Sequence, residues 1–502
     1  MQATGKAGTG GPRVERRSID FVPENERHGS PGQQFTLWFG ANMQITAIVD
    51  GALAVLFGAD ALWAIIGLLV GNLLGGAVMA LHAAQGPKLG LPQMISSRAQ
   101  FGIFGAVIPL VLVVVMYLGF AATGTVLSGQ AISLILHTGT PAVGMIVFGA
   151  LTIVVATLGY KYIHMLGRIA TVVGILGFTY LGIRLLTSQD VGALLGAGGF
   201  EFPTFLLAIS LGAGWQLTYG PYVADYSRYL PSKTPARKTF MSAYFGTVIG
   251  SQWSMTLGAL FAALALPKGA RFLDGQVAFL GNLSGGGLIA VVIYLVIVTG
   301  KLTVNTLNAY GGYMTMLTSV TAFTRKSAVA SWTRFVYVIG FIGLSVLIAV
   351  LASPDFIANF KNFVLLLLMV FIPWSSINLV DYYLVSKEKV DIPALYDLNG
   401  RYGRWNKTAL LSYAIGIVIQ IPFLAQTLYT GPMTDLLGGA DISWLVGLVV
   451  TAIVFYPLAK RNSNAPAEMV YPTELGPAES ESDSDAGAVE PVAGPVSKSA
   501  AV

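Results

Sequence analysis

Polar side chains recur inside apolar segments of this chain, and their types indicate binding chemistry. Lys301 lies about fourteen residues into one apolar run, near mid-bilayer, where a charge costs about 2.5–3.5 kcal/mol even on the milder scales. Asn305 and Asn308 follow it about one helical turn apart. Trp215 and Gln216 stand in a glycine-rich stretch of another run. An ammonium, amides and an indole suit a cation and a flat polar ligand, so we interpret these residues as parts of a binding site.

Other kinds of chemistry are excluded by what the sequence lacks. The chain has no cysteine, which excludes disulfides, thiol catalysis and cysteine-based metal sites. Its four histidines lack metal-ligand spacing, and no carboxylate pair near a histidine and no phosphate-binding loop occurs, so we expect neither an enzyme nor a cofactor. The sequence shows no repeated filter-like carbonyl loop and no ring of charges, so an ion channel is not expected. The net charge is +5, but the basic residues are distributed according to membrane topology and do not cluster in a patch, so no nucleic-acid partner is expected. No obligate protein partner is evident from the sequence either.

The composition predicts an all-α polytopic membrane protein. Of the 502 residues, 54% are hydrophobic and 11% are charged, and the apolar segments are repeatedly long enough to cross a bilayer as helices. We predict twelve transmembrane helices, at residues 35–57, 60–84, 103–136, 141–159, 161–186, 202–229, 238–264, 287–319, 332–352, 356–385, 408–428 and 441–459.

Lysine and arginine predict the orientation of these helices in the cell membrane. With the amino terminus inside, the outer loops and nearby helix ends carry only Arg184, Lys268, Arg271 and Lys361, and the inner ones carry many more basic residues. This asymmetry predicts that both termini are cytoplasmic. Residues 1–34 are expected to form a flexible basic arm, and 462–502 an acidic disordered tail.

Two predicted helices carry polar interruptions at depth. The first contains Gly40–Thr46 and Asp50, and the sixth contains Gly212–Pro231, with Gly214–Gly220 expected to be unwound. Small and polar residues would also let helices pack closely. Because the interruptions lie five helices apart in matching positions, we favour broken helices 1 and 6. They imply two inverted repeats, at residues 35–186 and 202–385, followed by helices 11 and 12 at residues 408–459.

Several motifs occur in order between about residues 35 and 385. They are Leu37–Met43 (LWFGANM), Gly86–Met94 (GPKLGLPQM) with Ser97–Gly102 (SRAQFG), Ala224–Pro231 (ADYSRYLP), Asn305–Tyr310 (NTLNAY) and Pro373–Tyr383 (PWSSINLVDYY). Together they resemble the nucleobase–cation symporter-1 family, in particular its purine and cytosine permease branch. The resemblance implies a LeuT-type core of helices 1 to 10. It also implies transport of purines, pyrimidines and related flat heterocycles with Na⁺ or H⁺ by alternating access.

The resemblance implies a site in which two aromatic plates hold a planar base. Phe120 takes the position of the plate on helix 3, where the family often has Trp; ordinary helix packing is the alternative for it. Gly124 takes the position one helical turn after Phe120, where the family usually has a polar residue. The glycine removes one hydrogen bond to the edge of the base and leaves space in the site. Trp215 is the expected second plate and Gln216 the edge donor and acceptor. The two would exchange roles if the alignment slips by one residue, and Tyr219 is a candidate cap.

Base-edge contacts are also implied on helix 8. Asn308 is the stronger candidate and Asn305 the weaker one; for both, a hydrogen bond to a neighbouring helix is the alternative.

A coupling-ion site between helices 1 and 8 is implied as well. In sodium-coupled members, hydroxyl groups of helix 8 and backbone carbonyls of helix 1 bind the ion together. In this chain the corresponding residues are Thr299 and Thr303 on helix 8 and Ala41 to Gln44 on helix 1. Such hard oxygen ligands suit Na⁺, and no other metal ion is expected. Our hypothesis is that the Lys301 ammonium takes the cation's place, gaining and losing the coupling proton, with Asp50 as its counter-charge. The alternative is that Lys301 snorkels or forms a fixed ion pair.

These observations predict a secondary transporter that takes up a nucleobase, cytosine or purine-like, by H⁺ symport. The alternative is a Na⁺-coupled carrier of another flat heterocycle, such as allantoin, hydantoin or a vitamin. Its partners are expected to be the small-molecule substrate and membrane lipid.

Overall fold

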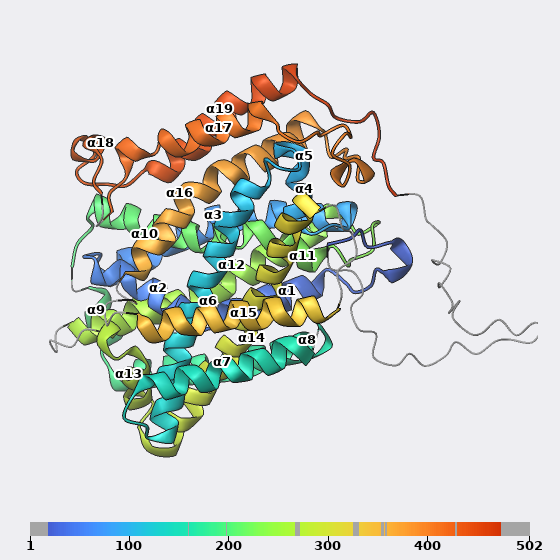
Figure 1. The fold of residues 1–502 in the computed structure, drawn as a ribbon. Coiled ribbons are helices and arrows are strands. Elements are labelled where there is room, and N and C mark those ends of the chain that lie inside the picture. The colour runs from blue at the N-terminus through green and yellow to red at the C-terminus, as the bar shows by residue number, and fades with distance from the viewer. Residues whose placement is uncertain are drawn as a thin grey trace, which may run out of the picture. The chain divides into compact units, whose positions relative to one another are not determined.

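Helices make up every regular element of the described chain (Figure 1). The computed structural model describes residues 19–158, 160–196, 198–266, 272–324, 331–352, 356, 359–426 and 429–472. The described residues up to Tyr471 form one compact unit.

The first half of the chain builds helices α1 to α9. Helix α3 is capped at both ends: the Asp60 carboxylate accepts a hydrogen bond from the Leu62 N–H at 3.0 Å before α3, and Gly90 ends α3 in the left-handed conformation, with φ 62°. The bounds are α1 Gly32–Asn42, α2 Ile45–Leu56, α3 Ala61–Leu89, α4 Gln93–Ser96, α5 Arg98–Phe101, α6 Val107–Leu136, α7 Pro141–Leu158, α8 Tyr160–Ser188 and α9 Val191–Leu195.

The second half builds α10 to α19. A 3₁₀ turn at Gly220–Tyr222 separates α10 from α11, and a π-helix at Val380–Val385 continues α16. The bounds are α10 Phe202–Leu217, α11 Ala224–Ser227, α12 Ala236–Ala265, α13 Gln276–Leu283, α14 Gly287–Thr324, α15 Ser331–Leu351, α16 Phe360–Leu379, α17 Lys407–Val418, α18 Pro432–Leu436 and α19 Ser443–Arg461.

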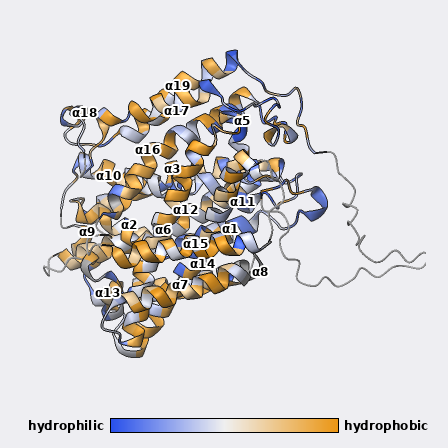
Figure 2. Ribbon diagram, viewed as in Figure 1, coloured by the Kyte–Doolittle hydropathy of each residue, from blue (hydrophilic) through white to orange (hydrophobic). Residues whose placement is uncertain are grey.

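Eight helices of the described chain are long and apolar enough to cross a membrane, and nine if α1 and α2 count as one bent span. Apolar residues dominate along these helices in Figure 2. The protein is therefore polytopic, as predicted, with fewer candidate spans than the predicted twelve. The other predicted spans coincide with shorter helices: α7 and α17 are apolar but short, and α10 ends at a break.

Glycines let the helices around α12 approach each other closely. Gly51 of α2 faces the Met255 backbone of α12, and Gly258 of α12 faces the Ile48 backbone of α2, so that a Cβ at either glycine would overlap with backbone. In addition, α12 packs against α1 and α3, α10 packs along α3, and α14 packs along α6 and α8. Small residues at such seams are typical of helix packing in membranes.

Among the described residues, both terminal segments are docked against the helices over part of their length. Ile19 and Val22 are buried, and the Val22 N–H donates to the Gly90 carbonyl at 2.9 Å. At the other end, Val470 exchanges backbone hydrogen bonds with the loop around Ile392, at 3.0 Å each. Buried apolar side chains and backbone hydrogen bonds offset the entropy of ordering these segments. The rest of both predicted segments, 1–18 and 473–502, lies outside the described residues.

The segment between α3 and α6 is held by Arg98. Its buried guanidinium donates to the Leu395 carbonyl at 3.1 Å and to the Thr318 carbonyl at 3.0 Å. Burial lowers the pKa of Arg98 to about 10, so the group remains protonated at neutral pH. Arg98 therefore ties two loops to the end of α14.

Candidate substrate and coupling site

The first helix is broken where its sequence predicts. Helix α1 ends at Asn42, α2 begins at Ile45, and their axes are bent by 61°. Gln44 between them is fully extended, with φ −148° and ψ 157°. The break therefore turns backbone and side-chain groups of residues 42–46 toward the interior of the protein.

The second break lies further along the chain than predicted. Helix α10 continues through Gly212, Gly214 and Gln216 to Leu217, and the 3₁₀ turn begins at Gly220. The reason is packing: a Cβ at Gly212 would lie 2.7 Å from the Leu68 carbonyl oxygen of α3, so this glycine serves a close helix contact. Trp215 and Gln216 thus stand in the last turn of α10, just before the break.

Lys301 reaches the first break. Its side chain is fully buried, and its Nζ donates to Gln44 Oε1 and to Thr46 Oγ1, both at 2.9 Å. A lysine ammonium carries three N–H donors, whereas the described residues offer Lys301 two acceptors, neither of them charged. Lys301 therefore joins α14 to the junction of α1 and α2.

Gly124 makes room for this lysine. A Cβ at position 124 of α6 would overlap with Lys301 Cε and Asn305 Oδ1 and would lie 2.9 Å from Lys301 Nζ. The space that the missing side chain leaves is thus filled by residues of α14. Gly124, Lys301 and Asn305 lie together, which links the predicted substrate and coupling residues.

Asp50 is fully buried one helical turn after Thr46 on α2. Neither of its carboxylate oxygens has a hydrogen-bond partner among the described residues, and no ion pair joins it to Lys301 there. The expected counter-charge thus lies near the lysine's hydroxyl partner but outside ion-pair distance of the lysine itself.

The two expected plates touch each other. The rings of Phe120 and Trp215 meet edge to face, with centroids 5.7 Å apart and planes at 83°. Phe360 and Phe363 pack on Phe120 in the same manner, with centroids at 5.7 Å and 5.6 Å. A base stacked between two parallel rings needs about 7 Å between their planes, twice a normal carbon contact distance. In this conformation the rings fill the space that such a base would occupy.

Trp215 is held by an amide of the first break, and Gln216 by other helices. Trp215 Nε1 donates to Asn42 Oδ1 at 2.7 Å. Gln216 Nε2 donates to Asn72 Oδ1 at 2.8 Å and to Ser251 Oγ at 2.9 Å, and its Oε1 accepts from Thr247 at 2.6 Å. The Gln216 amide is therefore engaged with α3 and α12, and the structure does not bring it to the plates as an open base-edge group.

The two asparagines of α14 keep unused hydrogen-bonding capacity. Asn305 Nδ2 donates to the Ala121 carbonyl of α6 at 2.9 Å, but its buried Oδ1 has no partner among the described residues. Asn308 Nδ2 is likewise buried and unpartnered there. Buried polar atoms without partners are costly, so a free acceptor and a free donor near Phe120's helix suit a polar ligand.

A cavity of about 370 Å³ reaches the coupling residues from the side where α1 begins. Its lining includes Ala41 and Thr303, together with His28 and Arg168. Thr299 is not among the lining residues: its hydroxyl donates to the Leu295 carbonyl of its own helix at 2.8 Å. Of the hydroxyls expected on helix 8, the structure therefore brings Thr303 to this cavity.

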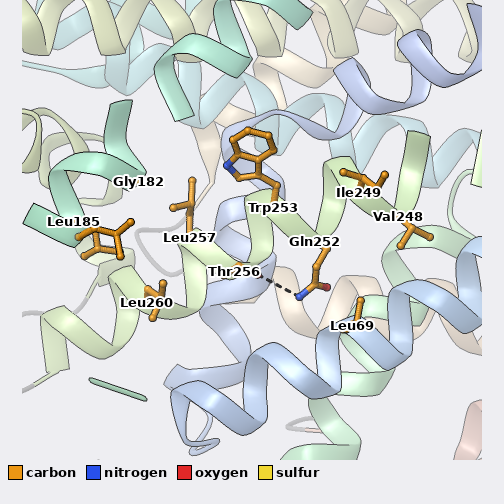
Figure 3. Close-up of a pocket in the computed structure, with 11 residues that line it drawn as sticks. Leu69, Gly182, Leu185, Val248, Ile249, Gln252, Trp253, Thr256, Leu257 and Leu260 are labelled. Carbon is orange, nitrogen blue, oxygen red and sulfur yellow. Dashed lines mark hydrogen bonds between the residues drawn. The ribbon is translucent and has the colours of Figure 1, made fainter. Parts of the chain in front are cut away.

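A cavity of about 520 Å³ lies between α3, α8 and α12 (Figure 3). Most of its lining is aliphatic, with Leu69, Leu185 and Leu257 among the residues drawn. Its Gln252 donates to Thr256 Oγ1 at 3.2 Å and to the Ile65 carbonyl at 3.1 Å. The lining thus offers little to the edge of a polar heterocycle, and none of the predicted site residues belongs to it.

Asn42 and Thr46 are functional candidates that were not singled out from the sequence. Both belong to the polar stretch Gly40–Thr46, so their residue types at depth are a usable signal. Their partners, Trp215 and Lys301, lie far away along the chain, and only the fold brings them together.

The chain is similar to known proteins in its sequence and in its fold. Residues 21–447 match the family described as permeases for cytosine/purines, uracil, thiamine and allantoin. The chain is 37% identical over 451 residues to YxlA of Bacillus subtilis, which carries the assignment of a purine-cytosine permease; the match covers 89% of this chain and 96% of that relative. It is 25% identical to a purine-cytosine permease of Emericella nidulans, over 88% of this chain and 87% of that one. The fold resembles that of Mhp1, a nucleobase-cation-symport-1 family transporter whose structure was solved in a closed conformation with bromovinylhydantoin bound. The TM-score is 0.72 and the sequence identity is 18%, and the match covers 91% of this chain and 98% of that one.

Proposed function

Since the chain belongs to the nucleobase–cation symport-1 family, we propose that it takes up cytosine or a purine together with a proton. The family makes it a secondary transporter for nucleobases or related heterocycles and not an enzyme, and its fold is LeuT-like. The twelve-helix, two-repeat arrangement with both termini in the cytoplasm is part of the proposal. The identity of the base and that of the coupling ion are also part of the proposal.

The contact of Lys301 with the first break is the observation that supports the proton. Its Nζ donates to Gln44 Oε1 and to Thr46 Oγ1, so an amine of the protein itself is placed at the polar break of the first helix. Two neutral acceptors match the two N–H donors of a neutral amine, and protonation adds a third donor that needs a new partner. Gaining and losing one proton there changes the hydrogen bonding of the break.

The aromatic plates and the asparagines support a planar polar substrate. Phe120 and Trp215 supply two faces once they part, and Asn305 Oδ1 and Asn308 Nδ2 supply one acceptor and one donor. A nucleobase edge presents both complements within one ring system. We assign no edge contact to Gln216, because its amide is engaged elsewhere.

The cavity that Ala41 and Thr303 help to line, together with residues around the start of α1, supports an exit on that side. Water in such a cavity would receive the coupling proton after the site opens to that side. Alternating access then consists of closing this route and opening the opposite one around the two broken helices.

Uptake into proteoliposomes tests the proposal. Radiolabelled cytosine and hypoxanthine are offered under an imposed proton gradient and then a sodium gradient, with uracil, adenine, guanine, allantoin and hydantoin as competitors. We expect accumulation with the proton gradient, and strongest competition from cytosine or a purine. Accumulation driven by sodium, or strongest competition from allantoin or hydantoin, would instead support a sodium-coupled carrier of another heterocycle. Accumulation under neither gradient would reject symport.

A further inference from the structure

Asn42 uses its whole side-chain amide in the interior of the protein. It is the last residue of α1 and is fully buried. Its Oδ1 accepts hydrogen bonds from Trp215 Nε1 at 2.7 Å, Ser251 Oγ at 2.9 Å and Tyr219 OH at 3.1 Å. Its Nδ2 donates to the Trp38 carbonyl at 2.7 Å and to Thr247 Oγ1 at 3.1 Å. An amide has two donors and one acceptor oxygen, so none of this capacity is left over.

The hydrogen bond to Trp215 joins the two broken helices at their breaks. Asn42 stands two residues before Gln44, the acceptor of Lys301, and Trp215 stands in the last turn of α10 before the second break. Trp215 also makes the edge contact with Phe120. One buried hydrogen bond therefore connects the candidate coupling site with the candidate substrate plate.

Separating this pair is unfavourable in a membrane interior. If Trp215 turned while Asn42 stayed in place, the indole N–H would become a buried donor without a partner, unless the rearranged site supplied one. The simplest way to keep the bond is for the two groups to move together. Tyr219, which donates to the same oxygen, follows α10 directly and would move with them.

We propose that Asn42 is the positioning residue that couples the cation site to substrate binding; this inference rests on the function proposed above. When Lys301 changes its hold on Gln44, residues 42–46 shift. Asn42 then carries the Trp215 ring out of its edge contact with Phe120, and the plates open for a base. The affinity for the base thereby depends on the protonation of the coupling site.

Substrate binding to purified protein tests this coupling. The dissociation constant of the preferred base is measured at mildly acid and mildly alkaline pH, and the ratio of the two values is the readout. Among the described residues, the titratable groups around this region include Lys301 on α14, Asp50 on α2, and Tyr219 and Tyr222 after α10, so Lys301→Met serves to assign the pH effect. In the wild type we expect a ratio of about 5- to 150-fold, the usual size of a coupling between two sites. In Asn42→Ala we expect a ratio near one, with the base still bound.

Two further variants separate this role from a merely structural one. Trp215→Phe keeps an aromatic plate but removes the N–H donor, so it should lose the ratio as Asn42→Ala does, even if Asn42→Ala fails to fold. Ser254→Ala is the matched control, because Ser254 donates to the backbone carbonyl of Asn42 at 2.8 Å and leaves the Trp215 bond intact; it should keep the wild-type ratio.

An undiminished ratio in Asn42→Ala or in Trp215→Phe would overturn the inference while leaving the proposed function standing. A wild type that binds the base with no pH dependence would overturn the inference too. A wild type that binds none of the bases would overturn both.

Discussion

At the scale of single residues, the site depends on two residues that no local pattern could pair. Lys301 and Gly124 stand on different helices, and the end of the lysine side chain lies in the space that a Cβ at position 124 would take. A lysine at this depth needs polar partners, and Gln44 and Thr46 supply them. The lysine and the glycine are therefore best understood as one unit of the coupling site.

Replacing Lys301 with Met should separate substrate transport from the proton gradient. A gradient of about one pH unit drives at most about tenfold accumulation in a one-to-one symport, since about 1.4 kcal/mol corresponds to a factor of ten. We expect wild-type accumulation to approach this limit and Lys301→Met to show none. Exchange of labelled for unlabelled base in the absence of a gradient is the control, and Lys301→Met should retain it. Accumulation by Lys301→Met under a pH gradient would contradict the role of this residue.

Replacing Phe120 with Ala should weaken base binding. Stacking of a base on an aromatic ring is worth about 1–3 kcal/mol, which corresponds to a dissociation constant raised about 5- to 150-fold. Phe245→Ala is the matched control, because Phe245 lies half-exposed on α12, away from the plates. Equilibrium binding of the labelled base to both variants checks the prediction. Equal affinities would assign Phe120 to helix packing alone.

At the scale of the elements, the seam between α2 and α12 fixes the position of the first break. Gly51 and Gly258 bring the two helices into backbone contact, and α12 also supplies Ser251 and Ser254 to Asn42. Such a seam has little space for an added side chain. The break therefore moves against α12 only as far as these contacts allow.

A leucine at Gly258 should destabilise the protein. Its side chain would overlap with the Ile48 backbone, and overpacking typically costs about 1–3 kcal/mol. Thermal unfolding in detergent, followed with the purified protein, should show a clearly lower midpoint than the wild type. Gly340→Leu is the control, because nothing lies within 4 Å of a Cβ at that helical glycine of α15. A midpoint lowered equally by both substitutions would contradict the close seam.

The two helix breaks show which element boundaries can be predicted from the sequence and which cannot. The first break, between Asn42 and Ile45, is found from local composition, because polar residues at depth mark the place where the helix is interrupted. The same reasoning misplaces the second break, because the packing partner of Gly212 on α3 is not visible along the chain. Gln216 illustrates the same limit: its residue type suits a base edge, but tertiary contacts with α3 and α12 engage it first.

At the scale of the whole molecule, the described helices make up a LeuT-like transporter core with docked ends. The amino-terminal segment reaches three separate regions: Val22 bonds to Gly90, the Ile19 carbonyl accepts from Tyr396 at 2.7 Å, and the Tyr229 carbonyl accepts from His28 at 2.6 Å. This segment therefore ties the end of α3 to the loops that follow α11 and α16.

The lack of cysteines makes the proposed topology directly testable. Single cysteines at Gly139, Gly199 and Asn399 fall in loops that the twelve-helix arrangement puts outside, outside and inside. In intact cells, a membrane-impermeant maleimide should label Gly139→Cys and Gly199→Cys. Asn399→Cys should react only after the membrane is opened, and the cysteine-free chain gives the background. Labelling of Asn399→Cys in intact cells would contradict two cytoplasmic termini with twelve spans.

The contact between Phe120 and Trp215 also has a consequence for binding kinetics. Because the rings occupy each other's space, a base can enter only after they part, so opening precedes association. In stopped-flow measurements, the observed binding rate should then rise with base concentration and level off at the rate of ring opening. Because the free protein alone sets that limit, it should be the same for every base, and a limiting rate that differs between bases would mean that the rings part only after the base has arrived.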